Sequence, residues 1–224
     1  MAEEQFRDAG RAQTSMLAPL EKAVLVWLAH RTPPWINSDH LTALGMLAMA
    51  GAGLSFWYAG TDKRGLLLVI VCLIVNWYGD SLDGTLARVR NRLRPRYGFY
   101  VDHVVDAVGT TCLLGGMALS GYMTDRLALG LMVGYFLLSI EVYLATYTIG
   151  TFYLSFWKFS PTELRILISI GALAAYLDPG VVPGGGRYRA FDIGGYIGLA
   201  AMAVMLCISI ARHTAWLYKA ERLD

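Results

Sequence analysis

Long apolar runs separated by short polar segments dominate the sequence. A helix needs about 20 apolar residues to cross the roughly 30 Å apolar core of a bilayer. The six runs that reach or approach this length cover residues 41–60, 65–89, 98–122, 127–152, 162–178 and 192–211. They lack the alternation of apolar and polar residues that strands of a membrane barrel show. The pattern therefore predicts an all-α integral membrane fold with six transmembrane helices.

A weaker pattern precedes the first run, over residues 5–31, where Pro19 can open a helix. The apolar centre of this segment, residues 23–29, is too short to span a bilayer. One face of the expected helix collects Leu20, Val24, Trp27 and Leu28. We therefore expect an amphipathic helix in the plane of the membrane interface. It would belong to a cytoplasmic N-terminal segment, residues 1–37, followed by a transmembrane domain over residues 38–224.

Composition and charge agree with a membrane protein. Hydrophobic residues make up 56% of the chain and charged residues 16%, against about 25% charged residues in soluble proteins. The net charge of +2 is too small to indicate a nucleic-acid partner. With six spans, 14 of the 19 Lys and Arg residues fall on the side that holds both termini and the 88–97 loop. The positive-inside rule places that side in the cytoplasm and makes residues 178–191 the longest external loop.

Four aspartates interrupt the second and third runs near their polar ends. Asp80 and Asp83 are three residues apart, and Asp102 and Asp106 are four apart, so each pair shares a helix face. Antiparallel packing of the two helices can bring all four carboxylates together at the cytoplasmic surface. Carboxylates at a membrane boundary are costly, and hard cations such as Mg²⁺ or Mn²⁺ compensate them. The pattern favours a two-metal centre able to hold a diphosphate.

The acids belong to a longer pattern, Asp80-x2-Asp83-Gly84-x2-Ala87-Arg88-x9-Gly98-x3-Asp102-x3-Asp106. This pattern resembles the signature of the CDP-alcohol phosphotransferase family, whose architecture is similar to six spans with an interfacial helix. The resemblance implies that an acceptor hydroxyl attacks the β-phosphate of a CDP-linked donor, forming a phospholipid phosphodiester and releasing CMP. It also implies a homodimer in the lipid bilayer, with the donor and the lipid meeting at the cytoplasmic face.

The resemblance further implies a role for each residue of the pattern. The four aspartates would bind two divalent metal ions, Mg²⁺ or Mn²⁺, and Asp106 would be the general base toward the acceptor hydroxyl. Arg88 would hold the diphosphate, for which its planar donors are suited. The nucleotide and diphosphate would be bound by Asp80, Asp83, Gly84, Ala87, Arg88 and Gly98.

A second segment precedes the first span, Ser38-Asp39-His40-Leu41-Thr42. It resembles the family's Pro-Asn-x-x-Thr segment, which helps to form the cytidine pocket, although Ser and Asp stand where Pro and Asn are usual. The resemblance adds Asp39 and Thr42 to the nucleotide-binding residues. A compatible alternative is that Ser38 or Asp39 caps the start of the following helix.

Other polar residues are weaker candidates. Acceptor binding could involve His103, Arg94, Arg96 and Arg165. The alternatives are a loop that is basic only because it faces the cytoplasm and, for His103, ordinary packing at the interface. Glu141 lies in the middle of a run, where a carboxylate is costly. It could pair with a polar neighbour, line the cavity or support the metal site.

The motif indicates the type of reaction more specifically than it indicates the substrates. The Asp102-His103 pair is similar to the choline and ethanolamine phosphotransferases, so we favour a CDP-aminoalcohol with a diacylglycerol-type lipid. The nine residues between Arg88 and Gly98 depart from the eight usual in that branch. The alternative is CDP-diacylglycerol with a polar alcohol such as inositol phosphate, glycerol phosphate or serine. Hypotheses of other classes are a divalent-cation transporter that uses the four aspartates, and an inactive scaffold.

Overall fold

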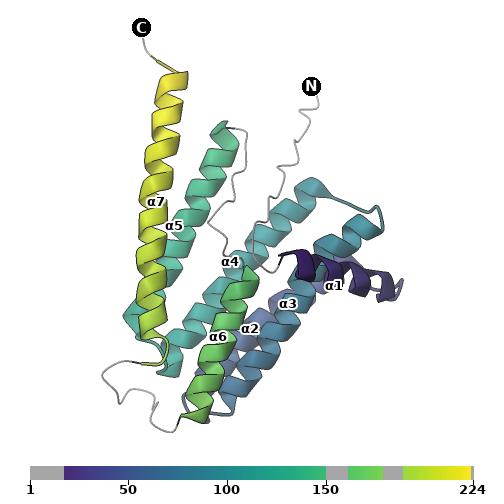
Figure 1. Ribbon diagram of the computed structural model, residues 1–224, viewed down its shortest axis with the longest axis vertical. Helices are drawn as coiled ribbons and strands as arrows, with labels where there is room; N and C mark the ends of the chain where they lie inside the picture. The colour runs from purple at the N-terminus through teal and green to yellow at the C-terminus, as the bar shows by residue number, and fades with distance from the viewer. Residues whose placement is uncertain (1–17, 150–160, 179–188, 223–224) are drawn as a thin grey trace.

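The computed structural model describes residues 18–149, 161–178 and 189–222, and these ranges contain helices but no β-strand (Figure 1). The helices of the described ranges are α1 (Ala18–Arg31), α2 (Ser38–Ala59), α3 (Gly65–Val89), α4 (Pro95–Ser120), α5 (Asp125–Ile149), α6 (Pro161–Leu177) and α7 (Asp192–Ala220). The all-α prediction is confirmed for this part of the chain.

Five of these helices, α2, α3, α4, α5 and α7, are long and apolar enough to cross a membrane. They correspond to five of the six predicted spans, and together they identify an integral membrane protein. The sixth predicted span corresponds to α6, which has 17 residues and is shorter than the roughly 20 that a bilayer takes. The exact number of spans therefore stays a prediction.

The topology of the chain also stays a prediction. Four of the basic residues used to orient the spans, Arg7, Arg11, Lys158 and Arg187, lie outside the described residues, as do residues 179–188 of the expected external loop.

Helices α2, α3 and α4 form the centre of the bundle, and α2 packs against both of the others. Helix α6 packs on α3, while α5 packs on α4 and carries α7 on its far side (Figure 1). Helix α1 lies across the bundle rather than along it, in contact with α3. This arrangement places the ends of α2, α3, α4 and α6 that bear the candidate site on one side of the molecule.

Small residues allow α2 to approach α3 and α4 closely. A Cβ atom on Gly79 of α3 would lie 2.6 Å from the backbone nitrogen of Gly45 on α2. A Cβ atom on Gly116 of α4 would overlap the backbone of Gly53 on α2. Such small-residue contacts are typical of helix packing in membranes. Gly79 therefore serves the close contact of α3 with α2.

Helix α1 begins at Ala18, and residues 5–17 of the predicted helix lie outside the described residues. Its buried side chains, Leu25 and Ala29, pack against apolar residues of α2 and α3. The apolar face predicted from the sequence is exposed at Leu20, Val24 and Trp27. Placement of this exposed face in the membrane interface stays a prediction.

Candidate active site

A cavity opens between α2, α3 and α4 near the end of the bundle that α1 crosses. Three of the four predicted aspartates, Asp80, Asp102 and Asp106, lie along its wall. The full lining is Thr42, Gly45, Met46, Met49, Asn76, Asp80, Asp102, Val105, Asp106, Gly109 and Thr110. The cavity therefore combines an acidic part with an apolar part formed by methionine and valine side chains.

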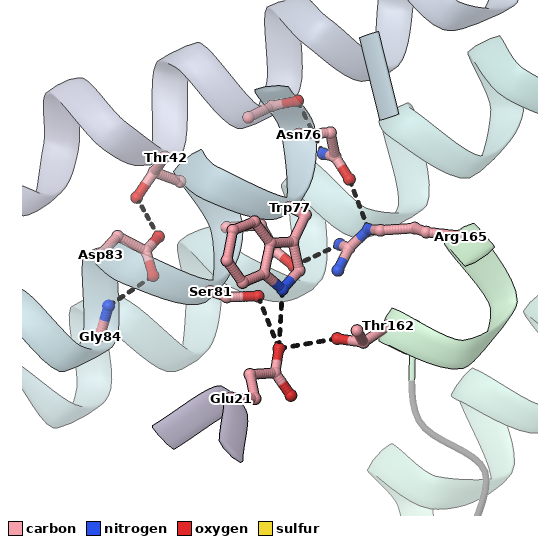
Figure 2. Close-up of polar contacts among 11 residues, drawn as sticks. Glu21, Thr42, Asn76, Trp77, Ser81, Asp83, Gly84, Thr162 and Arg165 are labelled. Atoms are coloured by element: carbon pink, nitrogen blue, oxygen red, sulfur yellow. Dashed lines mark hydrogen bonds and ion pairs between the residues drawn. The ribbon is translucent and has the colours of Figure 1, made fainter. Parts of the chain in front are cut away.

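The fourth aspartate, Asp83, is buried and held by the start of α2 (Figure 2). The Thr42 hydroxyl lies 2.6 Å from the Asp83 Oδ2 atom, to which it donates, and the backbone N–H of Gly84 donates to Oδ1. The Ser38 hydroxyl donates to the Asp83 carbonyl oxygen at 3.0 Å. The segment of residues 38–42 that the sequence singled out is thus in direct contact with the longer motif.

Asp80 is paired with Arg165, which reaches it from the start of α6. The guanidinium NH2 group lies 2.5 Å from Asp80 Oδ2, and its Nε–H donates to Asn76 Oδ1 at 2.7 Å. Asn76 in turn donates to the Gly45 carbonyl oxygen at 2.8 Å. The side chain of Arg165 is only 11% exposed, whereas that of Asp80 is 37% exposed, so only the cation of this pair is largely removed from water.

These contacts determine how the acids are arranged. Within residues 18–149, 161–178 and 189–222, no group of three or more His, Cys, Asp or Glu side chains is placed to hold a metal ion. Asp80 faces Arg165 and Asp83 faces Thr42, while Asp102 and Asp106 line the cavity from α4. The role of the four aspartates as metal ligands stays a prediction.

The arginines that follow α3 differ in their surroundings. Arg88 is exposed, and its guanidinium donates to the Thr85 hydroxyl at 3.3 Å. Arg94 forms an ion pair with Asp39, and its guanidinium stacks on the Tyr97 ring at 4.1 Å. The hydrogen bond to Asp39 raises the pKa of Arg94. Asp39 and Arg94, predicted to bind the nucleotide and the acceptor respectively, therefore contact each other.

Arg90 anchors the link between α1 and α2, a role that the sequence did not suggest. Its Nη1 atom donates to the Ile36 carbonyl oxygen at 2.5 Å, and its Nη2 atom donates to the carbonyl oxygens of Thr32 at 2.7 Å and Pro33 at 3.1 Å. An arginine that follows an apolar helix is expected from topology alone, so only the fold shows this structural use.

Open space surrounds two glycines of the motif. A Cβ atom on Gly84 would meet only the end of the Arg88 side chain, at 4.0 Å, and a Cβ atom on Gly98 would meet nothing within 4 Å. Ala87 is half-buried beside them in the sequence motif. Helix packing requires a glycine at Gly79 but not at Gly84 or Gly98. The open space at Gly84 and Gly98 leaves room for a ligand to approach the backbone.

Two of the weaker acceptor candidates, His103 and Arg96, lie in the N-terminal part of α4. The imidazole of His103 is half-buried, and its Nδ1–H donates to the Phe99 carbonyl oxygen at 2.5 Å. The His103 ring also meets Tyr143 of α5 edge to face, with 5.0 Å between the ring centroids. Arg96 is exposed on the first turn of α4. His103 is therefore a packed residue that sits directly beside Asp102.

Glu141 joins α5 to α7. Its Oε2 atom accepts a hydrogen bond from the Ser209 hydroxyl at 2.7 Å, and its Oε1 atom lies 2.6 Å from Nδ1 of His213. Of the three roles left open by the sequence, pairing with polar neighbours is the one that the structure shows.

The start of α2 is capped by Asn37 rather than by Ser38 or Asp39. The Asn37 Oδ1 atom accepts from the backbone N–H of His40 at 3.0 Å, and Nδ1 of His40 accepts from the backbone N–H of Asn37 at 3.3 Å. This reciprocal capping box satisfies two of the N–H groups that a helix start leaves unpaired. It leaves the Ser38 hydroxyl available for its contact with Asp83.

Residues 35–210 match the CDP-alcohol phosphatidyltransferase family. Cholinephosphotransferase 1 of Gallus gallus is 27% identical over 179 residues, which cover 76% of this chain and 51% of that protein. Archaetidylinositol phosphate synthase of Pyrococcus horikoshii is 25% identical over 104 residues, which cover 46% of this chain and 52% of that protein. The chain thus spans about half the length of these curated relatives. The family match includes the whole acidic motif and most of the chain, and the protein belongs to the CDP-alcohol phosphatidyltransferase family.

Proposed function

We propose that the protein transfers a substituted phosphate group from a CDP-alcohol to an acceptor hydroxyl, forming a phospholipid phosphodiester and releasing CMP. The observation that carries the proposal is the acidic cavity of a family member, with Asp80, Asp102 and Asp106 on its wall. The acceptor oxygen would bond to the β-phosphorus, and the bond from that phosphorus to the oxygen bridging the two phosphates would break. CMP would leave with the bridging oxygen.

The donor set fits divalent metal ions. Four carboxylates, with no cysteine among them, are the hard oxygen ligands that Mg²⁺ and Mn²⁺ prefer. Asp80, Asp83, Asp102 and Asp106 would hold two such ions, as the family resemblance implies. When bound, the ions neutralise the charge of the diphosphate and of the leaving phosphate.

The chain's own residues would supply binding, orientation and proton transfer. Arg165 neutralises Asp80 from the α6 side, and the exposed Arg88 is available to the diphosphate. The space beside Gly84 and Gly98 would admit the nucleotide, with Ala87, Asp39 and Thr42 near it. Asp106, which lines the cavity, would take the proton of the acceptor hydroxyl. A carboxylate is a weak base at neutral pH, so much of the rate would come from positioning.

We further propose that residues 38–224 form a six-span domain, with α6 as the sixth span, and that both termini are cytoplasmic. The excess of basic residues on the side of the 88–97 loop supports this orientation. The active site would then lie at the cytoplasmic face, where a soluble nucleotide and a membrane lipid can meet. A homodimer is proposed from the family resemblance alone.

Two substrate pairs fit this reaction, and we favour a CDP-aminoalcohol with a diacylglycerol-type lipid. The similarity to a protein named a cholinephosphotransferase covers 76% of the chain, and His103 follows Asp102 directly. The alternative is CDP-diacylglycerol with a polar alcohol, which the similarity to an archaetidylinositol phosphate synthase over 46% of the chain supports.

The test is a donor panel given to the purified protein in nanodiscs with Mn²⁺. One arm supplies CDP-choline or CDP-ethanolamine with labelled diacylglycerol, and the other supplies CDP-diacylglycerol with labelled inositol phosphate, glycerol phosphate or serine. We expect labelled phospholipid and CMP in equal amounts in the first arm. Product only in the second arm would select the alternative pair. If neither arm releases CMP and the protein takes up Mn²⁺ into proteoliposomes, the transferase proposal is wrong and a divalent-cation transporter is favoured.

A further inference from the structure

The side chain of Glu21 on α1 forms hydrogen bonds to both α3 and α6 (Figure 2). Its Oε1 atom accepts hydrogen bonds from the Trp77 indole N–H at 2.9 Å, from the Ser81 hydroxyl at 3.5 Å and from the Thr162 hydroxyl at 2.7 Å. Trp77 and Ser81 belong to α3, and Thr162 belongs to α6. One carboxylate oxygen therefore ties α1 to two helices that are far apart in the sequence.

The two helices joined by Glu21 are those that form the Asp80–Arg165 pair. Ser81 follows Asp80 on α3, and Thr162 lies three residues before Arg165, on the same turn of α6. Arg165 then contacts both Asp80 and Asn76 of α3. Glu21 thus holds the first turn of α6 against the part of α3 that the guanidinium must reach.

The other end of α1 is fixed as well. Leu25 and Ala29 pack on α2 and α3, and the guanidinium of Arg90 binds the carbonyl oxygens of Thr32 and Pro33 just after the helix. A helix anchored at both ends can transmit a fixed position to α6. Glu21 lies before residue 35, where the family match begins, so the matched domain alone does not contain this contact.

We propose that Glu21 is a positioning residue, which sets the place of Arg165 at Asp80 by tying α1 to α3 and α6. The inference deepens the proposed function and rests on it for its kinetic consequence. Loss of the Glu21 carboxylate leaves the Trp77 and Thr162 donors without this acceptor and releases the first turn of α6. Arg165 then no longer holds Asp80 in one geometry, and a displacement of about 1 Å can lower a rate by about a hundredfold.

The test compares Glu21→Ala with Glu21→Gln, which keeps an acceptor oxygen in place, and with Lys22→Ala, a control at an exposed position on the same turn. We expect Glu21→Ala to lower kcat about tenfold or more, with near-native rates for the other two variants. The double variant Glu21→Ala/Arg165→Ala should be no slower than Arg165→Ala alone. Losses that multiply would show that Glu21 acts independently of Arg165 and would overturn the proposal.

A second readout does not depend on catalysis. Amide hydrogen exchange in nanodiscs should be faster at the start of α6, residues 161–168, in Glu21→Ala but not in Glu21→Gln or Lys22→Ala. Unchanged exchange in Glu21→Ala would overturn the proposal. If exchange changes as expected while the wild-type protein transfers no phosphate group, the tie between α1 and α6 stands and the proposed function fails.

Discussion

Arg165 of α6 and Asp80 of α3 form an ion pair, with 2.5 Å between the guanidinium NH2 group and Oδ2. The carboxylate of Asp80 remains 37% exposed toward the cavity, whereas the Arg165 side chain is 11% exposed. The cation is therefore a fixed part of the protein interior, and the carboxylate faces the space where a ligand would bind. A buried cation in this place lowers the cost of gathering several carboxylates at a membrane boundary.

Replacement of Arg165 should therefore impair transfer. We expect Arg165→Ala to lower kcat/KM by more than about tenfold, because Asp80 would lose the cation that holds its carboxylate in one position. Arg165→Lys should recover only part of the loss, since an ammonium cannot reach Asp80 and Asn76 in the same planar geometry. Initial rates measure both effects. Arg126→Ala, at an exposed position at the start of α5, is the control, and a native rate in Arg165→Ala would contradict the prediction.

The hydroxyl of Thr42 should contribute to the rate of transfer, because it holds the Asp83 carboxylate. Thr42→Val removes the 2.6 Å contact with Asp83 at nearly constant volume, and a hydrogen bond to a charged group is worth about 1.5–3 kcal/mol. We expect a fall in kcat/KM of about tenfold or more, and substantial recovery in Thr42→Ser. Equal rates in the valine and serine variants would show that the hydroxyl has no part in the site.

Arg90 should contribute to stability. Arg90→Ala removes three hydrogen bonds to the carbonyl oxygens of the α1–α2 link, and we expect a loss of about 2 kcal/mol in the free energy of unfolding. Thermal unfolding in detergent, followed by circular dichroism, measures the decrease in Tm. The matched control is Arg92→Ala, on an exposed residue of the same loop. Equal Tm values for the two variants would contradict the assigned role.

The α5–α7 contact should depend on Glu141. Glu141→Leu leaves the half-buried polar groups of Ser209 and His213 without their shared acceptor, and we expect a cost of about 1 kcal/mol. The double variant Glu141→Leu/His213→Leu should regain part of that stability, because both partners of the pair become apolar. Thermal unfolding of the two variants tests this. A single variant as stable as the wild-type protein would show that the contact is not needed for folding.

The sequence predicted well what depends on local pattern. The apolar runs at residues 65–89 and 162–178 correspond closely to α3 and α6, because helix length follows directly from the length of an apolar run. Three of the four aspartates lie along one cavity, since helical spacing and a short connecting loop restrict where their side chains can go.

Contacts between distant residues could not be predicted in the same way. Glu21 meets Thr162 across 141 positions of the chain, and no periodicity links two single polar residues in different helices. The same holds for Arg90, whose partners are backbone carbonyl groups that every residue has. The sequence shows that residue 79 is a glycine, but it does not show what the small side chain is for. The packing of α2 on α3 shows that this glycine allows the two helices to approach closely.

The central claim is that the acidic cavity carries out metal-dependent transfer from a CDP-linked donor, and CMP release by the purified protein in nanodiscs tests it most directly. We expect release that requires Mn²⁺ or Mg²⁺, stops with a chelator, returns when the ion is restored, and falls by more than about a hundredfold in Asp106→Asn. CMP release at the same rate with the chelator present and in Asp106→Asn would contradict the account.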